Sequence, residues 1–178
     1  MTDRTLGPPL PEHCTKELLV LCCGNPLFGD DGFGPAVAQR LLHEGGIPEH
    51  VAVIDAGTSV RELLFDLLLG TPRLRRVVII DAIDAGRMPG EILELGLDQL
   101  PRGGALGFSS HHPPTATLLH QLHDSAGVHV DVIACQVSSF SEELHEGLSP
   151  PVGDAVSRAA ATIARRFFTA RGTACGDP

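Results

Sequence analysis

The feature of the sequence that most constrains its fold is the alternation of short apolar runs with helical patterns. Largely apolar runs occupy residues 18–23, 51–55, 77–81 and 130–137. Such runs are typical of strands that are buried on both faces, as they are in a parallel sheet. Because strands that alternate with helices form right-handed βαβ units, we predict an α/β fold. The prediction is a single doubly wound, three-layer domain with a mostly parallel, twisted sheet of about five strands flanked by helices.

The segments between these runs account for the helices and for the fifth strand. Apolar residues at helical spacing predict helices at about 34–42, 60–68, 114–123 and 149–167. A short strand is predicted at 91–95, after a proline–glycine turn. We allow for one short antiparallel strand in this otherwise parallel sheet.

Length and composition limit the classes of protein that the chain can belong to. Its 178 residues suit one domain, which we place at 17–170 between a flexible leader at 1–16 and a flexible tail at 171–178. The formal net charge of −9 argues against nucleic acid and anionic membranes as partners. No run of apolar residues is long enough to span a membrane, and the five scattered cysteines lack metal-site spacing. We therefore expect a cytoplasmic monomer.

Acidic residues follow three of the predicted strands. Asp30 and Asp31 lie among four glycines after the first strand, and Asp55 and Asp81 close the second and third. Ligands of an open parallel sheet bind beyond the carboxyl ends of its strands, so these carboxylates predict a site at that edge. Asp55 is equally well explained as a turn cap. For the Asp30–Asp31 pair we favour a function, because several glycines in one loop are costly to order.

Two of the nine histidines stand apart from the rest. His111 and His112 follow a loop rich in glycine and serine and precede a predicted helix. One histidine with two aspartates from other loops is a ligand set suited to a divalent ion such as zinc or nickel. A carboxylate that acts as a general base on water is the alternative chemistry. The remaining histidines are expected to be solvated: His13, His43, His50, His120, His123, His129 and His145.

The glycine-rich loop fits other chemistries less well. Its glycines do not have the G-x-G-x-x-G spacing of dinucleotide-binding proteins, and the loop lacks the lysine of a P-loop. Asp30 and Asp31 would repel a phosphate at the point where it should dock. The chain also has no G-x-S-x-G motif, so a serine hydrolase is disfavoured.

Ordered motifs across about residues 18–165 resemble those of the nickel–iron hydrogenase maturation endopeptidases. They are Gly24-Asn25-x4-Asp30-Asp31-Gly32-x-Gly34, Asp55-x-Gly57-Thr58, Asp81-Ala82 followed by Pro89-Gly90, Ser110-His111, and Gly147-Leu148-Ser149-Pro150. The first motif is fairly specific, and the joint order of all five strengthens the resemblance.

The resemblance implies a peptidase that removes a C-terminal extension from the large subunit of a nickel–iron hydrogenase after nickel insertion. It implies that Asp31, Asp81 and His111 contact the nickel carried by that precursor, with His112 as the alternative ligand if the alignment slips by one residue. A resident zinc is the alternative metal. Asp31 or Asp81 would activate water, or the nickel would polarise the scissile carbonyl.

The resemblance also assigns a substrate-discriminating role to the turn that holds Asp55, Gly57 and Thr58, and supporting roles to Asp30 and Asn25. Two other functions remain open at this point. One is a non-catalytic nickel-binding assembly factor for hydrogenase that uses the same three metal-contacting residues. The other, less favoured, is a Rossmann-like nucleotide-binding domain.

Overall fold

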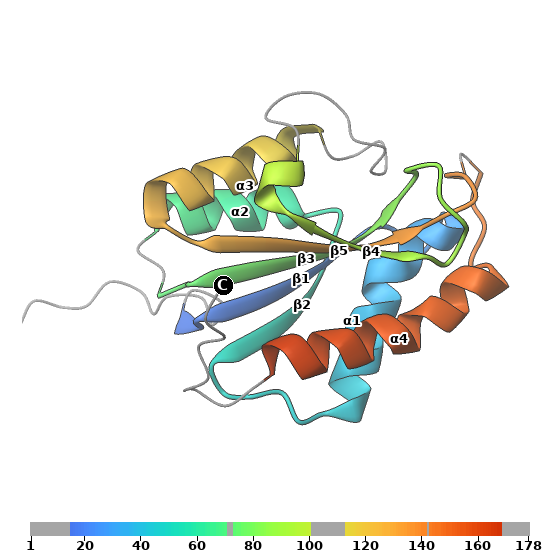
Figure 1. The fold of residues 1–178 in the computed structure, drawn as a ribbon, viewed down its shortest axis with the longest axis horizontal. Coiled ribbons are helices and arrows are strands. Elements are labelled where there is room, and N and C mark those ends of the chain that lie inside the picture. Colours follow the sequence, from blue (N-terminus) through green and yellow to red (C-terminus); the bar gives the residue numbers. More distant parts are fainter. Residues whose placement is uncertain (1–14, 71–72, 101–112, 142, 169–178) are drawn as a thin grey trace, which may run out of the picture.

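A computed structural model describes residues 15–70, 73–100, 113–141 and 143–168 of the chain. This part forms one five-stranded sheet with two helices on each face (Figure 1). The strands are β1 Leu18–Cys23, β2 Val51–Gly57, β3 Arg76–Ile83, β4 Ile92–Gly96 and β5 His129–Gln136. The helices are α1 Phe33–Glu44, α2 Val60–Leu69, α3 Pro113–Ala126 and α4 Pro150–Phe167. No helix in the described ranges has the length and apolar character that a membrane crossing requires.

The strand order is β2-β1-β3-β5-β4, with β4 antiparallel to β5 and the other neighbours parallel. The predicted α/β fold, with its mostly parallel sheet and one short antiparallel strand, is therefore confirmed. The chain passes from β1 to β2 on one side and later returns to β3 on the other. The crevice between the carboxyl ends of β1 and β3 is thus a topological switch point, where doubly wound proteins bind their ligands.

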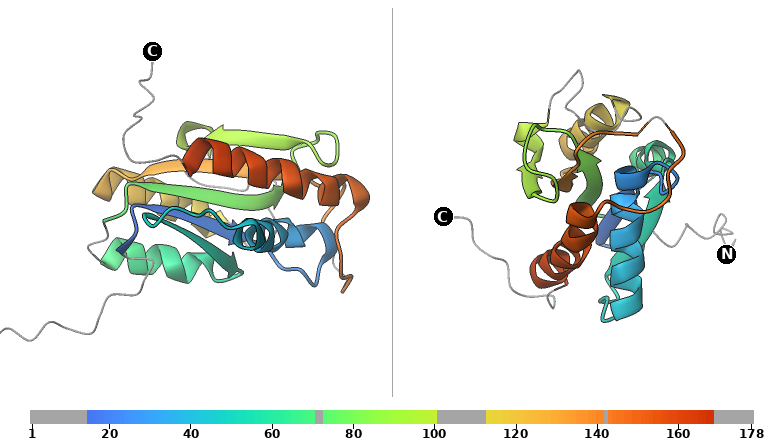
Figure 2. Two further views of the ribbon diagram at one scale, coloured as in Figure 1. Left: turned by 90° about the horizontal axis from the view of Figure 1, so that it is seen from below. Right: turned by 90° about the vertical axis from the view of Figure 1, so that its right-hand side faces the viewer.

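The central strand β1 shows why the domain has three layers. All six of its residues are buried, and successive side chains point to opposite faces of the sheet. Leu19 and Leu21 pack with apolar residues of α2 and α3, whereas Val20 and Cys22 pack with those of α1 and α4. Figure 1 and Figure 2 show the sheet between these two helix pairs.

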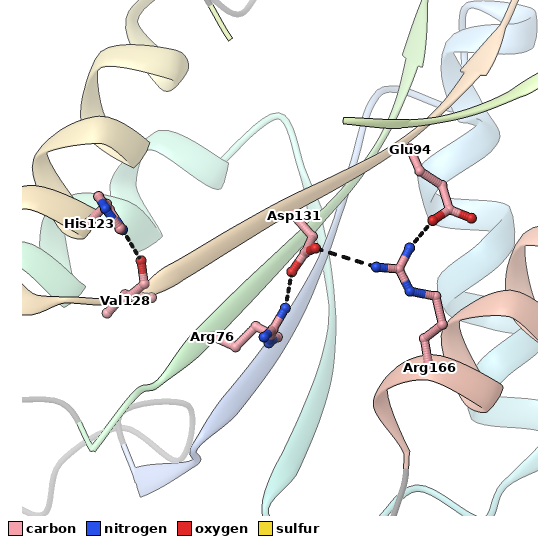
Figure 3. A network of polar contacts seen from close by, with 6 residues as sticks. All are labelled: Arg76, Glu94, His123, Val128, Asp131 and Arg166. Atoms are coloured by element: carbon pink, nitrogen blue, oxygen red, sulfur yellow. Dashed lines mark hydrogen bonds and ion pairs between the residues drawn. The ribbon is translucent and has the colours of Figure 1, made fainter. Parts of the chain in front are cut away.

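A cluster of charged residues joins β3, β4, β5 and α4 on the side of the domain away from the switch point. Arg76 at the start of β3 pairs with Asp131 near the start of β5, and Arg166 of α4 pairs with Glu94 of β4 (Figure 3). Arg166 also lies 3.6 Å from Asp131. The guanidinium groups of both arginines face the ring of Phe167, at 5.8 Å and 4.9 Å from its centroid. This cluster holds α4 against β4 and β5. It lies away from the carboxyl ends of β1 and β3, where the loops of the candidate site are found.

Two predicted details are wrong. Both β2 and β3 continue two residues past their aspartates, so Asp55 and Asp81 lie inside strands rather than at their ends. The cause for β3 is pairing with β5, which continues to Ile83 opposite Gln136. His120 is buried rather than solvated, because α3 turns it toward Leu100, whose carbonyl lies 3.0 Å from Nε2. Most of the predicted leader and tail lies outside the described residues, and the domain limits stay a prediction.

Helix α1 approaches the sheet very closely at Gly34. A Cβ added there would lie 2.1 Å from the carbonyl oxygen of Cys23 and 2.9 Å from that of Ile80. Both obstacles are backbone atoms of central strands, so neither can move aside locally. The glycine therefore allows α1 to lie directly on β1 and β3, and so fixes the end of the loop that precedes α1.

We expect Gly34→Ala to destabilise the protein by at least about 2 kcal/mol, because the new methyl group overpacks the helix–sheet contact. The same substitution at Gly153 in α4 is the matched control. A Cβ there meets only Leu148 Cβ at 4.0 Å, so Gly153→Ala should keep or raise the stability through its helix propensity. Urea unfolding of both variants measures the difference. Equal stability of the two variants would contradict the close approach of α1.

Candidate active site

Asp31 lies in the loop between β1 and α1, at the switch point of the sheet. It belongs to a short 3-10 turn, Gly29–Gly32, and its side chain is 4% exposed. The backbone N–H of Asn25 donates to Oδ2 at 2.9 Å. The other oxygen, Oδ1, is buried and has no hydrogen-bond partner among the described residues. Because an unsatisfied buried carboxylate oxygen is costly, Oδ1 of Asp31 is a candidate contact for a ligand.

Gly24 gives this loop its shape. It follows β1 directly and adopts φ of +121°, which side-chain-bearing residues rarely adopt. A Cβ on Gly24 would lie 1.9 Å from the backbone carbonyl oxygen of Asp31. Its N–H donates to the carbonyl of Gly57 at 3.0 Å, which joins the start of the loop to the end of β2. The loop can therefore fold back over the strand and bring Asp31 to the crevice.

Asp81 supplies a second buried carboxylate, from β3. It is 3% exposed, and its Oδ1 accepts the N–H of Ala82 at 2.8 Å. Its pKa is raised to about 8, chiefly by burial and in smaller part by the negative charge of Asp31, while the N–H of Ala82 acts in the opposite direction. The negative charge of Asp31 thus acts on Asp81. A proton on Asp81 or a cation beside it relieves the repulsion between the two carboxylates.

A small cavity of about 30 Å³ lies beside Asp81, between the sheet and α3. Its lining includes Cys23 and Thr115 together with apolar side chains such as Leu119 and Val132. This volume is enough for one or two water molecules. A water beside a carboxylate whose pKa lies near neutrality is suited to general-base chemistry.

Cysteine chemistry does not fit this site. Cys22 and Cys23 are both buried free thiols at the end of β1. Burial raises the pKa of both, and nearby carboxylates raise it further, chiefly Asp55 for Cys22 and Asp81 for Cys23. Because the thiolate is the nucleophilic form, thiols held neutral in this way are poor nucleophiles.

Asp30 faces away from this crevice, although it adjoins Asp31 in the sequence. Its Oδ1 accepts the backbone N–H of Ser149 at 2.6 Å, and its Oδ2 accepts the hydroxyl of the same serine at 2.8 Å. The supporting role predicted for Asp30 therefore concerns a distant segment, the start of α4. Asn25 also supports the loop, since its Oδ1 accepts the N–H of Leu27 at 3.0 Å.

Asp55 lies on the rim of a groove on the α1 side of the sheet. Its carboxylate is exposed and accepts the N–H of Gly57 at 3.2 Å, so it caps its own turn. Thr58 next to this turn is also exposed. The groove has a volume of about 480 Å³, and its lining includes Asp55, Pro26 and Gly32 of the Asp31 loop, and Leu42 of α1. The turn therefore faces a groove that borders the loop of Asp31.

The predicted histidine ligand cannot be placed, because His111 and His112 both lie outside the described residues. Within the described ranges, no three His, Cys, Asp or Glu side chains group closely enough to hold a metal ion. The two aspartates are thus the part of the predicted ligand set that the structure places.

Gln136 is an organising residue that the sequence reasoning missed. It is 1% exposed at the end of β5, and its Oε1 accepts the N–H groups of Ala85 at 2.8 Å and Arg87 at 3.1 Å. Its Nε2 donates to Oδ1 of Asp84 at 3.1 Å. Gln136 thus fixes the turn that follows β3. An amide at the end of an apolar strand was the available signal.

Comparisons with known proteins agree with this geometry. The profile of the family described as hydrogenase maturation protease matches residues 35–166. An inferred hydrogenase maturation protease of Methanocaldococcus jannaschii is 39% identical over 145 residues, which cover 81% of this chain and 92% of the relative. The hydrogenase 3 maturation protease of Escherichia coli is 30% identical over 148 residues, covering 78% of this chain and 83% of the relative.

A solved structure, the hydrogenase maturating endopeptidase HybD of Escherichia coli, superposes with a TM-score of 0.66 and 25% identity. The match covers 85% of this chain and 94% of that protein. A family profile over most of the domain, relatives at this identity and a common fold all agree. This chain therefore belongs to the hydrogenase maturation protease family and is a peptidase.

Proposed function

We propose that the protein removes the C-terminal extension from the large-subunit precursor of a nickel–iron hydrogenase once nickel has been inserted. The observation that carries the proposal is the pair of buried aspartates at the switch point of a chain of this family. Asp31 offers a buried carboxylate oxygen that has no hydrogen-bond partner among the described residues. Asp81 is also buried, and its pKa is raised to about 8. Both features suit contact with a cation.

In this proposal Asp31, Asp81 and His111 contact the nickel that the precursor carries, with His112 as the alternative to His111. Carboxylate and imidazole ligands suit nickel and zinc, so a resident zinc is the alternative metal. A cation at this position would replace the proton on Asp81 and supply the missing partner of Asp31. The peptidase would then act only on nickel-loaded precursors, because only these supply the cation that the two aspartates contact.

Two routes to peptide hydrolysis are compatible with the site. Asp31 or Asp81 acts as the general base on a water molecule, for which the cavity beside Asp81 has room. Alternatively, the nickel polarises the scissile carbonyl and the carboxylates hold the nickel in place. In both routes Asp31 and Asp81 are catalytic residues, because they touch the metal or the water.

We assign substrate recognition to the turn of Asp55, Gly57 and Thr58. The support is the groove, whose lining includes Asp55 of this turn together with Pro26 and Gly32 of the loop of Asp31. The precursor segment next to the scissile bond would lie in this groove. The three described cysteines, Cys22, Cys23 and Cys135, carry free thiols, which agrees with a reaction in a reducing cytoplasm.

We expect the protein to shorten a nickel-loaded precursor and to leave the nickel-free precursor intact, because only the former supplies the cation for the two aspartates. Mass spectrometry of both forms after incubation detects the released peptide. Equal cleavage of the two forms would refute recognition of nickel. If neither form is cleaved while the protein still binds the loaded precursor, the assembly-factor function is correct instead.

A further inference from the structure

The loop that carries Asp31 is fastened on its outer side to the segment 145–149, which leads into α4. The backbone N–H of Gly29 donates to the carbonyl of His145 at 2.6 Å. The N–H of His145 donates in return to the carbonyl of Leu27 at 2.9 Å. These two bonds tie the middle of the loop to a segment far along the chain.

The side chain of Asp30 makes the strongest attachment of this kind. Each of its carboxylate oxygens accepts one hydrogen bond from Ser149, at 2.6 Å from the backbone N–H and at 2.8 Å from the hydroxyl. Bonds to an ionised acceptor are stronger than neutral ones, and Asp30 is half-buried. We name this pair the Asp30–Ser149 clamp.

The clamp is not an ordinary helix cap. Ser149 is the N-cap residue of α4, but its hydroxyl makes no capping bond to its own helix. The next two residues, Pro150 and Pro151, have no N–H to satisfy. The hydroxyl of Ser149 is therefore used for the loop.

We propose that Asp30 and Ser149 are positioning residues, which hold Asp31 in the orientation that meets the metal of the precursor. This inference rests on the proposed function. Asp30 and Asp31 are neighbours in one short 3-10 turn, with the first side chain bonded to the start of α4 and the second buried. A shift of Asp30 therefore displaces Asp31, and displaced supports of metal ligands typically cost about 10–100-fold in activity.

The test uses Asp30→Asn, Ser149→Ala and Ser149→Thr with the nickel-loaded precursor. Asparagine removes the negative charge of the acceptor and one of its two acceptor oxygens, alanine removes the hydroxyl, and threonine keeps it. We expect the first two variants to lower kcat by about 10–100-fold. Gly29 and Leu148, the neighbours of the clamp residues, line the groove, so Kd for the precursor is measured beside kcat, and a loss confined to Kd would overturn the positioning role in favour of substrate binding. Ser149→Thr should retain the rate of wild type.

Ala159→Gly controls for a general weakening of α4. Ala159 is fully buried in this helix and has no part in the clamp, so the variant lowers the melting temperature without touching the loop. It should cleave at the wild-type rate well below its melting temperature. Folded Asp30→Asn and Ser149→Ala proteins with wild-type kcat would overturn the inference, as would an equal loss of kcat in Ala159→Gly. Failure of the wild type to cleave would instead refute the proposed function.

Discussion

Asp31→Asn is expected to reduce cleavage of a nickel-loaded precursor by at least about 100-fold, because it removes the charge that is meant to face the cation. The substitution is nearly isosteric. The amide oxygen of asparagine can still accept the N–H of Asn25, which now donates to Oδ2 at 2.9 Å. The fold should therefore survive, and the loss should appear in the rate of peptide release measured by mass spectrometry.

Asp66→Asn is the matched control for this experiment. Asp66 is an exposed residue of α2, so the same change of charge there should leave the cleavage rate unaltered. Circular dichroism of both variants verifies that they are folded. If Asp31→Asn cleaved as fast as Asp66→Asn, Asp31 would be excluded as a contact of the metal and as the base.

Most of the fold could be predicted from the sequence, because burial on both faces leaves a plain signal in parallel strands. The apolar run at 18–23 coincides with β1, and each predicted helix overlaps an observed one. The ends of strands were harder, since β3 continues to Ile83 through pairing with β5. Pairing of this kind depends on a partner about fifty residues away, which local patterns do not reveal.

The sequence predicted which loop carries the candidate site, but not which residues the side chains of that loop contact. Two adjacent aspartates among glycines indicated function, yet the sequence could not show that Asp30 turns to Ser149 and Asp31 to the crevice. The different directions of the two side chains depend on the segment 145–149, which comes back to this loop just before α4. Gln136 was missed for the same reason, because its partners near Asp84 meet it only in the folded sheet.

The site also shows why an isolated sequence pattern leaves chemistry undecided. Asp55 was open to both a capping and a recognition role, and its capping bond leaves the proposed recognition role open. Its carboxylate caps the turn at Gly57, and the same turn borders the groove beside the Asp31 loop. A local hydrogen bond therefore does not exclude a function, because an exposed carboxylate has acceptor positions to spare.

Asp81→Asn should abolish cleavage and, unusually for a buried substitution, raise stability at alkaline pH. In the folded protein burial raises the pKa of Asp81 to about 8, compared with an ordinary value of 3.8. Between these values the native state holds a proton that the unfolded chain has released. The stabilisation is therefore complete below the ordinary pKa and is lost as the pH rises through the folded one.

The side chain of asparagine does not titrate in this pH range, and its amide oxygen can still accept the N–H of Ala82. The stability advantage of Asp81→Asn over wild type should therefore grow from about pH 4 upward and level off above about pH 8. At the plateau we expect a melting temperature higher by about 5–10 °C, corresponding to a few kcal/mol in a domain of this size. Thermal unfolding of both proteins across this range measures the difference, in which the effects of other titrating groups largely cancel.

The contribution of Asp31 to this effect can be separated by the Asp31→Asn variant. Its negative charge adds to the raised pKa of Asp81, so removing it should narrow the pH range over which stability is lost. Parallel stability curves for wild type and Asp81→Asn would contradict a proton held on Asp81 in the folded protein. If Asp81→Asn is both more stable at high pH and unable to cleave, a cation that replaces the proton of Asp81 in the complex would account for both results, because selection for stability alone would have favoured asparagine.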